Sequence, residues 1–439
     1  MTGRFDILVA GAGPAGIAAA VSAAAAGKRV GLVDDNPAAG GQIWRGGARL
    51  PTVARDWLEK LAASSVFRLQ GWRIFASPSR GVLRAEGNTG CCDLEYNQLV
   101  IATGARERFL PFPGWTLPNV MGAGGLDAMV RGGLPIAGKR VVVAGTGPLL
   151  LAVAAHLTRK GAKIVAICEQ ASLRRFVPFC ATLLGEPAKI MQGIEYALST
   201  FGSKIHTGCW PVSAKGEDIL RSVTLGRGDR QWEVSCDYLA CGFHLVPNLE
   251  LPALMDCRID NGFVVVDDLQ QTSISGIFCA GEPTGIGGVE MALLEGKIAG
   301  LAASGKLDEA RKLARRRRRR LAFVRALSTV TELDPNLKPV ATGATIVCRC
   351  EDVPHERLRG FTSWREAKLH TRCGMGPCQG RVCGAATEFL FGWDMHSTLT
   401  AIRPPLYPVQ VSSLRDPDKL EYEGAVSALT GEQRSKETE

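Results

Sequence analysis

Apolar runs and glycine turns alternate along the first part of the chain. Residues Phe5 to Ala10 are largely apolar and predict a strand, and the alanine-rich stretch Ile17–Ala26 predicts a helix. A second apolar run, 29–33, predicts another strand and ends at two aspartates. The order strand, loop, helix, strand is typical of a nucleotide-binding fold.

The first loop carries glycines at the three positions of the dinucleotide fingerprint. Its predicted cofactor-binding residues are Gly11, Gly13, Pro14, Ala15 and Gly16. The first glycine permits a tight turn, the second lets a pyrophosphate approach the backbone, and the third lets helix and strand pack closely. Asp34, at the end of the second strand, is placed to bind a ribose, with Asp35 as the alternative. We therefore predict a dinucleotide site here.

A second fingerprint follows in the middle of the chain. A strand over 139–144 leads into Gly145 and Gly147, then a helix, and then a strand that ends at Glu169. Leu150 stands at the third glycine position and opposes close helix–strand packing. Glu169 would bind a free ribose hydroxyl and repel a 2′-phosphate, which favours NADH over NADPH. Whether this site binds NADH or is repurposed stays open.

Three further small-residue loops lie outside the two fingerprints. They contain Gly41-Gln42, Thr103-Gly104 and Gly281-Glu282. The last two follow apolar strands and resemble the FAD-contact motifs of the flavoprotein reductases that have two dinucleotide domains. In that superfamily the acid after the last glycine holds the ribityl chain of the flavin. The usual residue is Asp, whereas this chain has Glu282, which is one methylene longer.

Four cysteines near the end of the chain form two close pairs. They are Cys348, Cys350, Cys378 and Cys383, and Cys373 is a fifth that could replace one of them. Thiolates are soft ligands that suit iron–sulfur clusters or zinc. Glycines around the second pair leave backbone N–H groups free to point at sulfur. The spacing predicts a metal site, and the choice between a 2Fe-2S cluster and zinc stays open.

Composition adds one basic run to this picture. The 439 residues are 46% apolar and 22% charged, so two or three globular domains are expected. The net charge is +9, and six of those charges come from the arginines at 315–320. The run has a helical pattern without interleaved aromatic residues, so we expect a solvated surface helix or a contact with an acidic subunit, and no nucleic-acid site.

Targeting and catalytic patterns are largely missing. No signal peptide precedes the first strand, and the longest apolar stretch, 141–157, is broken by a glycine turn. We expect a cytoplasmic protein, or one attached peripherally to the inner face of the membrane. The middle of the chain has no Cys-x-x-Cys redox pair, and no Ser/His/Asp or His-rich constellation indicates a hydrolase.

With these motifs together, the chain resembles the α subunits of hetero-oligomeric, dye-linked amino-acid dehydrogenases. This group includes opine oxidases, D-hydroxyproline dehydrogenase and, more distantly, hydrogen cyanide synthase. The resemblance runs over about residues 5–410, and its motifs include 102–106, 111–115, 145–150 and the cysteine block 371–383. That block also resembles bacterioferritin-associated ferredoxin, which carries a 2Fe-2S cluster. The resemblance implies that Cys378 and Cys383 are ligands and that Cys373 is a bystander.

The expected architecture is α/β, with two nested Rossmann-like dinucleotide-binding domains and a small C-terminal α-helical cysteine domain. Residues 1–115 and 255–335 would form a discontinuous FAD-binding domain, and 116–254 the second nucleotide-binding domain. Residues 336–400 would form the 2Fe-2S domain, and 401–439 a Pro-rich, charged tail.

The resemblance also implies a division of labour. A flavoprotein β subunit would oxidise the C–N bond of an amino acid or opine, and this chain, with no catalytic residue of its own, would pass the electrons through FAD and a 2Fe-2S cluster to a quinone or dye. The family also allows an FMN between subunits and a small ferredoxin-like γ subunit. Two other hypotheses stay open, a free-standing NADH-dependent reductase and a zinc-stapled nucleotide-binding scaffold.

Overall fold

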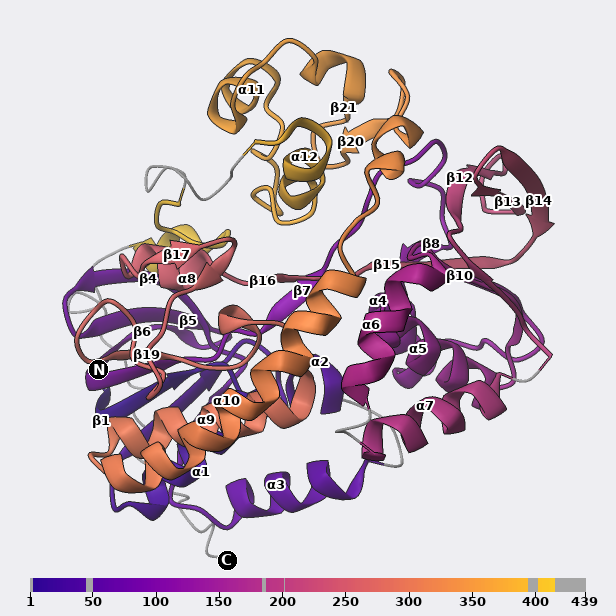
Figure 1. The fold of residues 1–439 in the computed structure, drawn as a ribbon. Coiled ribbons are helices and arrows are strands. Elements are labelled where there is room, and N and C mark those ends of the chain that lie inside the picture. Colours follow the sequence, from indigo (N-terminus) through magenta and orange to yellow (C-terminus); the bar gives the residue numbers. More distant parts are fainter. Residues whose placement is uncertain (1–2, 45–49, 184–186, 201, 394–401, 415–439) are drawn as a thin grey trace, which may run out of the picture. The chain divides into compact units, whose positions relative to one another are not determined.

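The computed structural model describes residues 3–44, 50–183, 187–200, 202–393 and 402–414 (Figure 1). The chain forms two compact units, each made of separate segments. Unit 1 comprises Met1–Gly104, Pro247–Arg319 and Leu399–Glu439, and unit 2 comprises Ala105–Val246 and Arg320–Thr398. Most of the predicted tail, 415–439, lies outside the described residues.

A seven-stranded sheet forms the centre of unit 1, in the order β3-β2-β1-β6-β5-β4, with β19 paired to β6. β1, β2, β3, β6 and β19 pair in parallel, and β4 and β5 add antiparallel partners. Of the parallel strands, β1, β2 and β19 are largely buried and apolar, as the centre of a sheet covered on both faces requires. The strands are β1 (Gly3–Ala10), β2 (Val30–Asp34), β3 (Phe67–Gln70), β4 (Arg73–Ser79), β5 (Val82–Gly87), β6 (Gly90–Ile101) and β19 (Ile277–Cys279).

Two helices of unit 1 pack with their backbones almost in contact. A side chain on Gly296 of α9 would lie 2.1 Å from the carbonyl oxygen of Ala15 in α1, and one on Gly300 would lie 2.3 Å from that of Ala19. Only glycine allows this approach, which places α9 beside the first glycine loop.

The helices of this unit are α1 (Pro14–Ala25), α2 (Gly41–Trp44), α3 (Thr52–Ala62), α8 (Glu250–Leu254), α9 (Gly288–Ala303) and the first part of α10 (Leu307–Val330).

Short elements complete unit 1. They are β17 (Ile259–Asp260), β18 (Phe263–Val264), and the 3-10 turns η1 (Glu282–Thr284) and η5 (Val411–Leu414). β16 (Leu245–Pro247) lies at the boundary of the two units.

Unit 2 is built on a parallel five-stranded sheet in the order β11-β10-β9-β15-β8. A separate antiparallel sheet holds β12, β13 and β14. The strands are β7 (Ala105–Glu107), β8 (Val120–Gly122), β9 (Arg140–Thr146), β10 (Lys163–Glu169), β11 (Lys204–Thr207), β12 (Trp210–Lys215), β13 (Ser222–Arg227), β14 (Arg230–Ser235) and β15 (Tyr238–Phe243). The helices are α4 (Ala123–Arg131), α5 (Pro148–Arg159), α6 (Leu173–Leu183) and α7 (Pro187–Ser199).

The cysteine-rich end of the chain belongs to unit 2 and has a small core of its own. Its elements are η2 (Pro335–Val340), β20 (Ile346–Cys348), β21 (Val353–Pro354), η3 (His355–Leu358), α11 (Trp364–Thr371) and α12 (Cys383–Phe391), drawn in orange in Figure 1. It is joined to the rest of unit 2 by Trp115 Nε1, which donates to Ile346 O at 2.6 Å, and by Arg106 Nε, which donates to Arg381 O at 3.0 Å.

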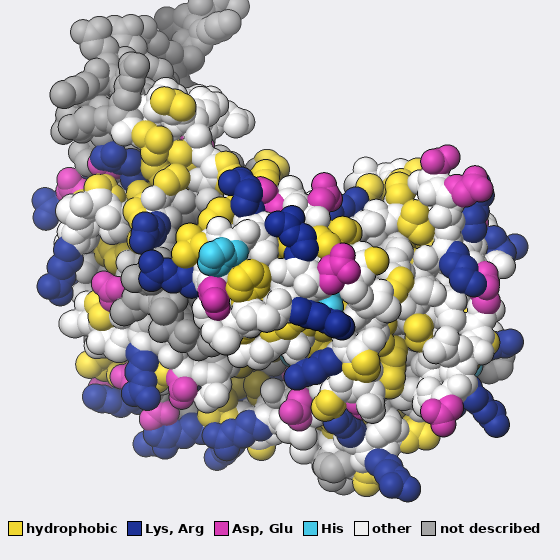
Figure 2. Space-filling view, turned by 90° about the horizontal axis from the view of Figure 1, so that it is seen from above, with side chains coloured by type: hydrophobic (Ala, Val, Ile, Leu, Met, Phe, Trp, Pro, Cys, Tyr) yellow, Lys and Arg dark blue, Asp and Glu magenta, His cyan; other side chains and the backbone are white. Residues whose placement is uncertain are grey.

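This architecture confirms the predicted fold class. Both predicted strand–loop–helix–strand repeats are present, and the C-terminal cysteine region is helical. The structure does not test the predicted domain boundaries. Among the described residues, no helix has the length and apolar character needed to cross a membrane. On the face drawn in Figure 2, lysine and arginine side chains lie among acidic and apolar ones.

Candidate functional site

The first glycine loop is shaped by two glycines that no other residue could replace. Gly11 has a φ of 106°, and a Cβ there would lie 2.3 Å from Ala102 O. A Cβ on Gly16 would lie 1.7 Å from Gly11 O. The nearest atom to a Cβ on Gly13 is the Cα of Gly41 at 4.0 Å, so this position is open. The loop therefore has the shape in which a pyrophosphate can approach the backbone.

The two aspartates at the end of β2 differ in their surroundings. Asp34 accepts a hydrogen bond from the amide of Ala12 in the glycine loop and another from Asn36 N at 2.8 Å. Asp35 is about half exposed and faces Arg73, with 3.5 Å between the charged atoms. The structure thus places Asp34 at the loop and Asp35 beside it.

The other predicted residues of unit 1 lie on segments that border this loop. Pro14 is the first residue of α1, which begins directly after Gly13, and Gln42 is an exposed residue of α2. Thr103 Oγ1 donates to Asn248 O at 2.8 Å, and Asn248 Nδ2 donates back to Thr103 O at 2.8 Å. Asn248, which the sequence pattern did not single out, thereby holds the Thr103-Gly104 turn.

Glu282 carries an unpaired buried acceptor. It follows Gly281, whose φ of 83° and close approach to Ala15 exclude a larger residue. Its Oε1 accepts from Gly288 N at 3.1 Å, whereas Oε2 is buried without a hydrogen-bond partner. Burial raises the pKa of Glu282 to about 7. A buried acceptor without a donor costs free energy unless a ligand supplies one. This geometry fits a hydroxyl-bearing ligand such as the ribityl chain of a flavin.

The second glycine loop, in unit 2, has a similar backbone. Gly145 has a φ of 142°, and a Cβ there would lie 1.9 Å from Gly242 O. Gly147 has a φ of 93° and precedes α5. Leu150, which replaces the third glycine, is buried, and its Cδ2 would lie 3.7 Å from a Cβ on Gly242. The larger residue is thus accommodated in the core of this sheet.

The carboxylate of Glu169 points toward the second glycine loop and is hydrogen-bonded to it. Its carboxylate accepts hydrogen bonds from Thr146 Oγ1 at 2.7 Å, Gly147 N at 2.7 Å and Ala171 N at 2.8 Å. Burial is the main influence on its pKa and raises it. Asp34 also accepts several protein hydrogen bonds, but it is only partly buried, whereas Glu169 is 8% exposed. Glu169 is therefore the less accessible of the two acids to a ribose.

A segment that follows α10 lies over this second loop. The Cγ2 of Thr331 is 3.0 Å from the place of a Cβ on Gly147. Gln170, next to Glu169, donates from Nε2 to Glu332 O at 3.0 Å and accepts from Asp334 N at 2.9 Å. A nucleotide at this loop would have to displace the segment 331–334, so the residues present do not form an open nicotinamide site.

The cysteines fall into a buried trio and a more exposed pair. The sulfur atoms of Cys348, Cys373 and Cys383 lie within 4.8 Å of one another. Those of Cys350 and Cys378 are 3.5 Å apart. Cys348 ends β20, Cys373 follows α11 and Cys383 opens α12, so short elements bring the trio together. Cys373 belongs to this trio, whereas the family resemblance makes it a bystander.

Two glycines shape the backbone around the sulfur atoms. Gly374 N donates to Cys348 Sγ at 3.5 Å, as the sequence pattern predicts for a glycine here. Its φ is 81°, and a Cβ would lie 2.5 Å from Trp364. A Cβ on Gly376 would lie 2.3 Å from the Cβ of Cys350. Such close turns allow amide groups to stabilise a thiolate or a bound cluster.

The buried trio is also arranged to hold a thiolate. Hydrogen bonds from Cys373 and Cys383 lower the pKa of Cys348. The same bonds raise the pKa of Cys383 and raise that of Cys373 to about 12. A thiolate is the form of cysteine that binds metals. Together with the nearby pair, the trio supplies soft donors that fit an iron–sulfur cluster or a zinc ion.

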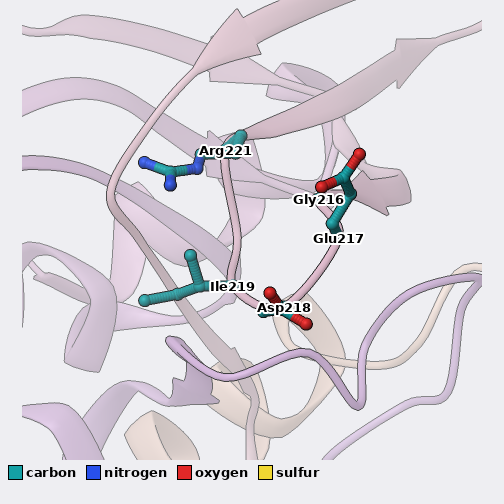
Figure 3. A pocket seen from close by; sticks show the side chains of 5 residues that line it. All are labelled: Gly216, Glu217, Asp218, Ile219 and Arg221. Carbon is teal, nitrogen blue, oxygen red and sulfur yellow. The ribbon is translucent and has the colours of Figure 1, made fainter.

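A hollow in unit 2 is lined neither by a glycine loop of the dinucleotide type nor by cysteines. It is lined by one loop between β12 and β13, with side chains from Glu217, Asp218, Ile219 and Arg221 (Figure 3). The two carboxylates and the guanidinium point in different directions (Figure 3). We therefore place the candidate site at the first glycine loop and at the cysteines.

Comparison with known proteins agrees with this arrangement. Residues 5–296 match the family model of the pyridine nucleotide-disulphide oxidoreductases. An opine oxidase subunit of Rhizobium meliloti is 31% identical to this chain, over 94% of this chain and 98% of that protein. Hydrogen cyanide synthase subunit HcnB of Pseudomonas protegens is 30% identical, over 94% of this chain and 98% of that protein.

Solved structures show the same fold. The L-proline dehydrogenase of P. horikoshii has a TM-score of 0.66 and 18% identity, over 95% of this chain and 81% of that chain. The thioredoxin reductase of T. acidophilum has a TM-score of 0.55 and 20% identity, over 69% of this chain and 98% of that one.

These matches confirm the predicted resemblance and the prediction of a Rossmann-type flavoprotein oxidoreductase. The chain belongs to the pyridine nucleotide-disulphide oxidoreductase family and, within it, to the group of oxidoreductase subunits that includes those of opine oxidase and hydrogen cyanide synthase named above.

Proposed function

We propose that this chain is the electron-transfer subunit of a multi-subunit dehydrogenase that oxidises the C–N bond of an amino acid or opine. A flavoprotein β subunit would carry out that oxidation, and this chain would pass the electrons to a quinone or similar acceptor. The observation that carries the proposal is one chain with both a dinucleotide loop beside an unpaired buried acceptor, Glu282, and two groups of close thiols, a buried trio and a more exposed pair. The names of its relatives, which are subunits, support the need for partners.

The residues at the first loop would hold FAD in defined ways. The amides of the loop 11–16 and the N-terminus of α1 would hold the pyrophosphate. Asp34 would accept from the adenosine ribose, and the free Oε2 of Glu282 would accept from a ribityl hydroxyl. The buried core around the loop would keep water from these contacts.

The cysteines would serve the second cofactor. We propose Cys348, Cys350, Cys378 and Cys383 as the ligands of a 2Fe-2S cluster, with Gly374 N–H directed at Cys348 sulfur. A flavin takes up two electrons and a cluster transfers them one at a time, which is the chemistry that these two groups would supply. The family's interface FMN and γ subunit would lie beyond this chain.

The proposal is tested with the purified chain and its partner. We expect the chain alone to show no activity on proline derivatives or opines with a dye as acceptor, and to gain activity when the β subunit is added. Dehydrogenase activity of the isolated chain would contradict the division of labour.

One observation keeps a second function in view. The second fold, with Gly145, Gly147 and Glu169, is complete as a backbone, and such a fold in a free-standing reductase would bind NADH. The segment 331–334 and the buried carboxylate of Glu169 count against it. Reduction of the bound flavin by NADH would establish this alternative.

A further inference from the structure

A buried ion pair in unit 1 lies directly behind the turn that carries Glu282. Arg317 Nε, on α10, donates to Glu295 Oε1, on α9, at 2.6 Å. The side chains are 10% and 3% exposed. Figure 1 shows the two helices side by side. Arg317 belongs to the six-arginine run that the sequence pattern assigned to a solvated face, so for this residue that expectation is wrong.

The second oxygen of Glu295 reaches the turn itself. Glu295 Oε2 accepts from Gly281 N at 3.0 Å and from Thr284 Oγ1 at 2.9 Å. Gly281 and Thr284 lie on either side of Glu282, so this one carboxylate holds both ends of the turn η1 (Glu282–Thr284). The position of the unpaired Oε2 of Glu282 therefore depends on Glu295.

Arg317 is tied to the sheet as well. With the Gln270 amide oriented so that both of its ends are satisfied, its oxygen lies 2.8 Å from Arg317 Nε and shares the single Nε–H with Glu295, and its nitrogen donates to Cys279 O at 2.8 Å. Gln270 is fully buried. Cys279 is the last residue of β19, two positions before Gly281. Arg317 thus connects the helix, the strand end and the carboxylate that holds the turn.

A buried carboxylate needs its counter-charge. When one partner of such a pair is removed, the other remains as an uncompensated buried charge, which is strongly unfavourable. Without Arg317, the Glu295 carboxylate would stay buried without a counter-charge, and turning toward solvent would relieve that cost. Such a movement weakens its hold on Gly281 and Thr284.

We propose that Arg317 is a positioning residue for the flavin, acting through Glu295 on the turn that presents Glu282. This inference rests on the proposed function, because it names FAD as the ligand of that turn. The role belongs to Arg317, which is buried. Arg319, on the same helix, is exposed and serves as the control.

The test compares FAD affinity among variants of the full-length chain. We measure the Kd of the FAD-free chain for FAD by flavin fluorescence, and its melting temperature in the same buffer. Arg317→Met should weaken FAD binding by at least about tenfold, equivalent to about 1.4 kcal/mol. Arg317→Lys keeps the charge and should recover most of the affinity. Arg319→Met, the matched control, should bind FAD as the wild type does.

Each outcome decides the question. A folded Arg317→Met chain with wild-type FAD affinity would overturn this inference alone. If that variant does not fold by circular dichroism, Thr284→Val, which removes one donor to Glu295, replaces it, and unchanged FAD affinity there would overturn the inference. A wild-type chain that binds no FAD would overturn the proposed function and this inference together, so the two failures are distinguishable.

Discussion

At the scale of single residues, the candidate flavin site depends on one carboxyl group that the protein leaves unpaired. Glu282 Oε2 is buried without a donor, although Oε1 accepts from Gly288 N. A buried unpaired acceptor lowers stability, so its presence in the fold indicates a use for it. A ligand hydroxyl would remove the cost on binding.

The raised pKa of Glu282 predicts a pH-dependent stability of the FAD-free chain. Its pKa is about 7 in the folded chain against an ordinary value of 4.5. Below pH 4.5 the group is protonated in both the folded and the unfolded chain, so it does not change the free energy of unfolding. Between pH 4.5 and 7 only the unfolded chain readily loses this proton, so the free energy of unfolding falls as the pH rises. At about 1.4 kcal/mol per pKa unit, the penalty above pH 7 is about 3 kcal/mol.

The measurement is the unfolding free energy of wild type and Glu282→Gln from pH 4.5 to 8. We expect wild type to lose about 3 kcal/mol relative to the variant over this range. Glu59→Gln, an exposed residue of α3, is the control and should not alter the pH profile. Parallel curves for wild type and Glu282→Gln would show that the carboxyl group titrates normally.

The five cysteines allow a direct test of the ligand set. Serine at Cys348, Cys350, Cys378 or Cys383 should each remove most of the bound iron, because a 2Fe-2S cluster needs four protein ligands. Cys373→Ser should keep its iron and its visible spectrum. Iron loss in Cys373→Ser with retention in Cys350→Ser would instead make the buried trio the core of the site.

Not every residue of the site was predictable from the sequence. Gly11, Gly13 and Asp34 stand at fixed spacings, because a phosphate loop imposes them, and the structure brings them together. Asn248 acts through two hydrogen bonds with Thr103, 145 residues earlier in the chain. Glu295 acts through bonds from Gly281, Thr284 and Arg317, which lie on three different elements or turns. No local pattern reports such contacts. The grouping of Cys373 with Cys348 likewise depends on tertiary structure.

At the scale of elements, the close contact of α1 and α9 assembles the candidate flavin site. It brings the N-terminus of α1 and the turn before α9 to one place, because Gly296 and Gly300 let the helices approach to backbone contact. The alanine-rich sequence of α1 also favours this contact, because its small side chains let neighbouring elements pack close to the helix.

Gly296→Ala tests this contact. The new methyl group would lie 2.1 Å from Ala15 O, so the helices must separate. Overpacking of this kind costs about 1–3 kcal/mol of stability, and we expect FAD to be lost as well. In Gly193→Ala on α7 nothing lies within 4 Å of the new methyl group. That control should be neutral or up to about 1 kcal/mol more stable.

Apolar runs bounded by glycine turns predicted the repeated strand–loop–helix–strand elements, because a strand buried on both faces is apolar along most of its length. The antiparallel sheet β12-β13-β14 and the short elements around the cysteines were not predicted individually. Their strands have six residues at most, and those of β12 and β14 are largely half-buried or exposed, so the apolar pattern is weak. Arg317 shows the limit within a helix, because its burial depends on Glu295 of a neighbouring helix.

At the scale of the whole molecule, the two nucleotide-type folds differ in whether the glycine loop is open to a ligand. The first has an open glycine position at Gly13 and an unpaired acceptor, whereas the second is covered by the segment 331–334. The sequence left the second site undecided, because the covering segment is about 160 residues away in the chain from the residue that it contacts, Gln170.

This difference predicts that NADH does not reduce the chain. On anaerobic mixing of the purified chain with NADH, we expect the flavin absorbance to persist, while dithionite bleaches it. Rapid bleaching by NADH would show that segment 331–334 moves aside and would favour the free-standing reductase.

The central claim is that one chain carries both a flavin and an iron–sulfur cluster. The most direct measurement is an anaerobic visible spectrum of the purified chain, with flavin, iron and acid-labile sulfide assayed on the same sample. The account predicts flavin bands with a broad reddish-brown shoulder and the iron and sulfide of one 2Fe-2S cluster per chain. Flavin without iron, or a colourless chain that contains zinc, would contradict it.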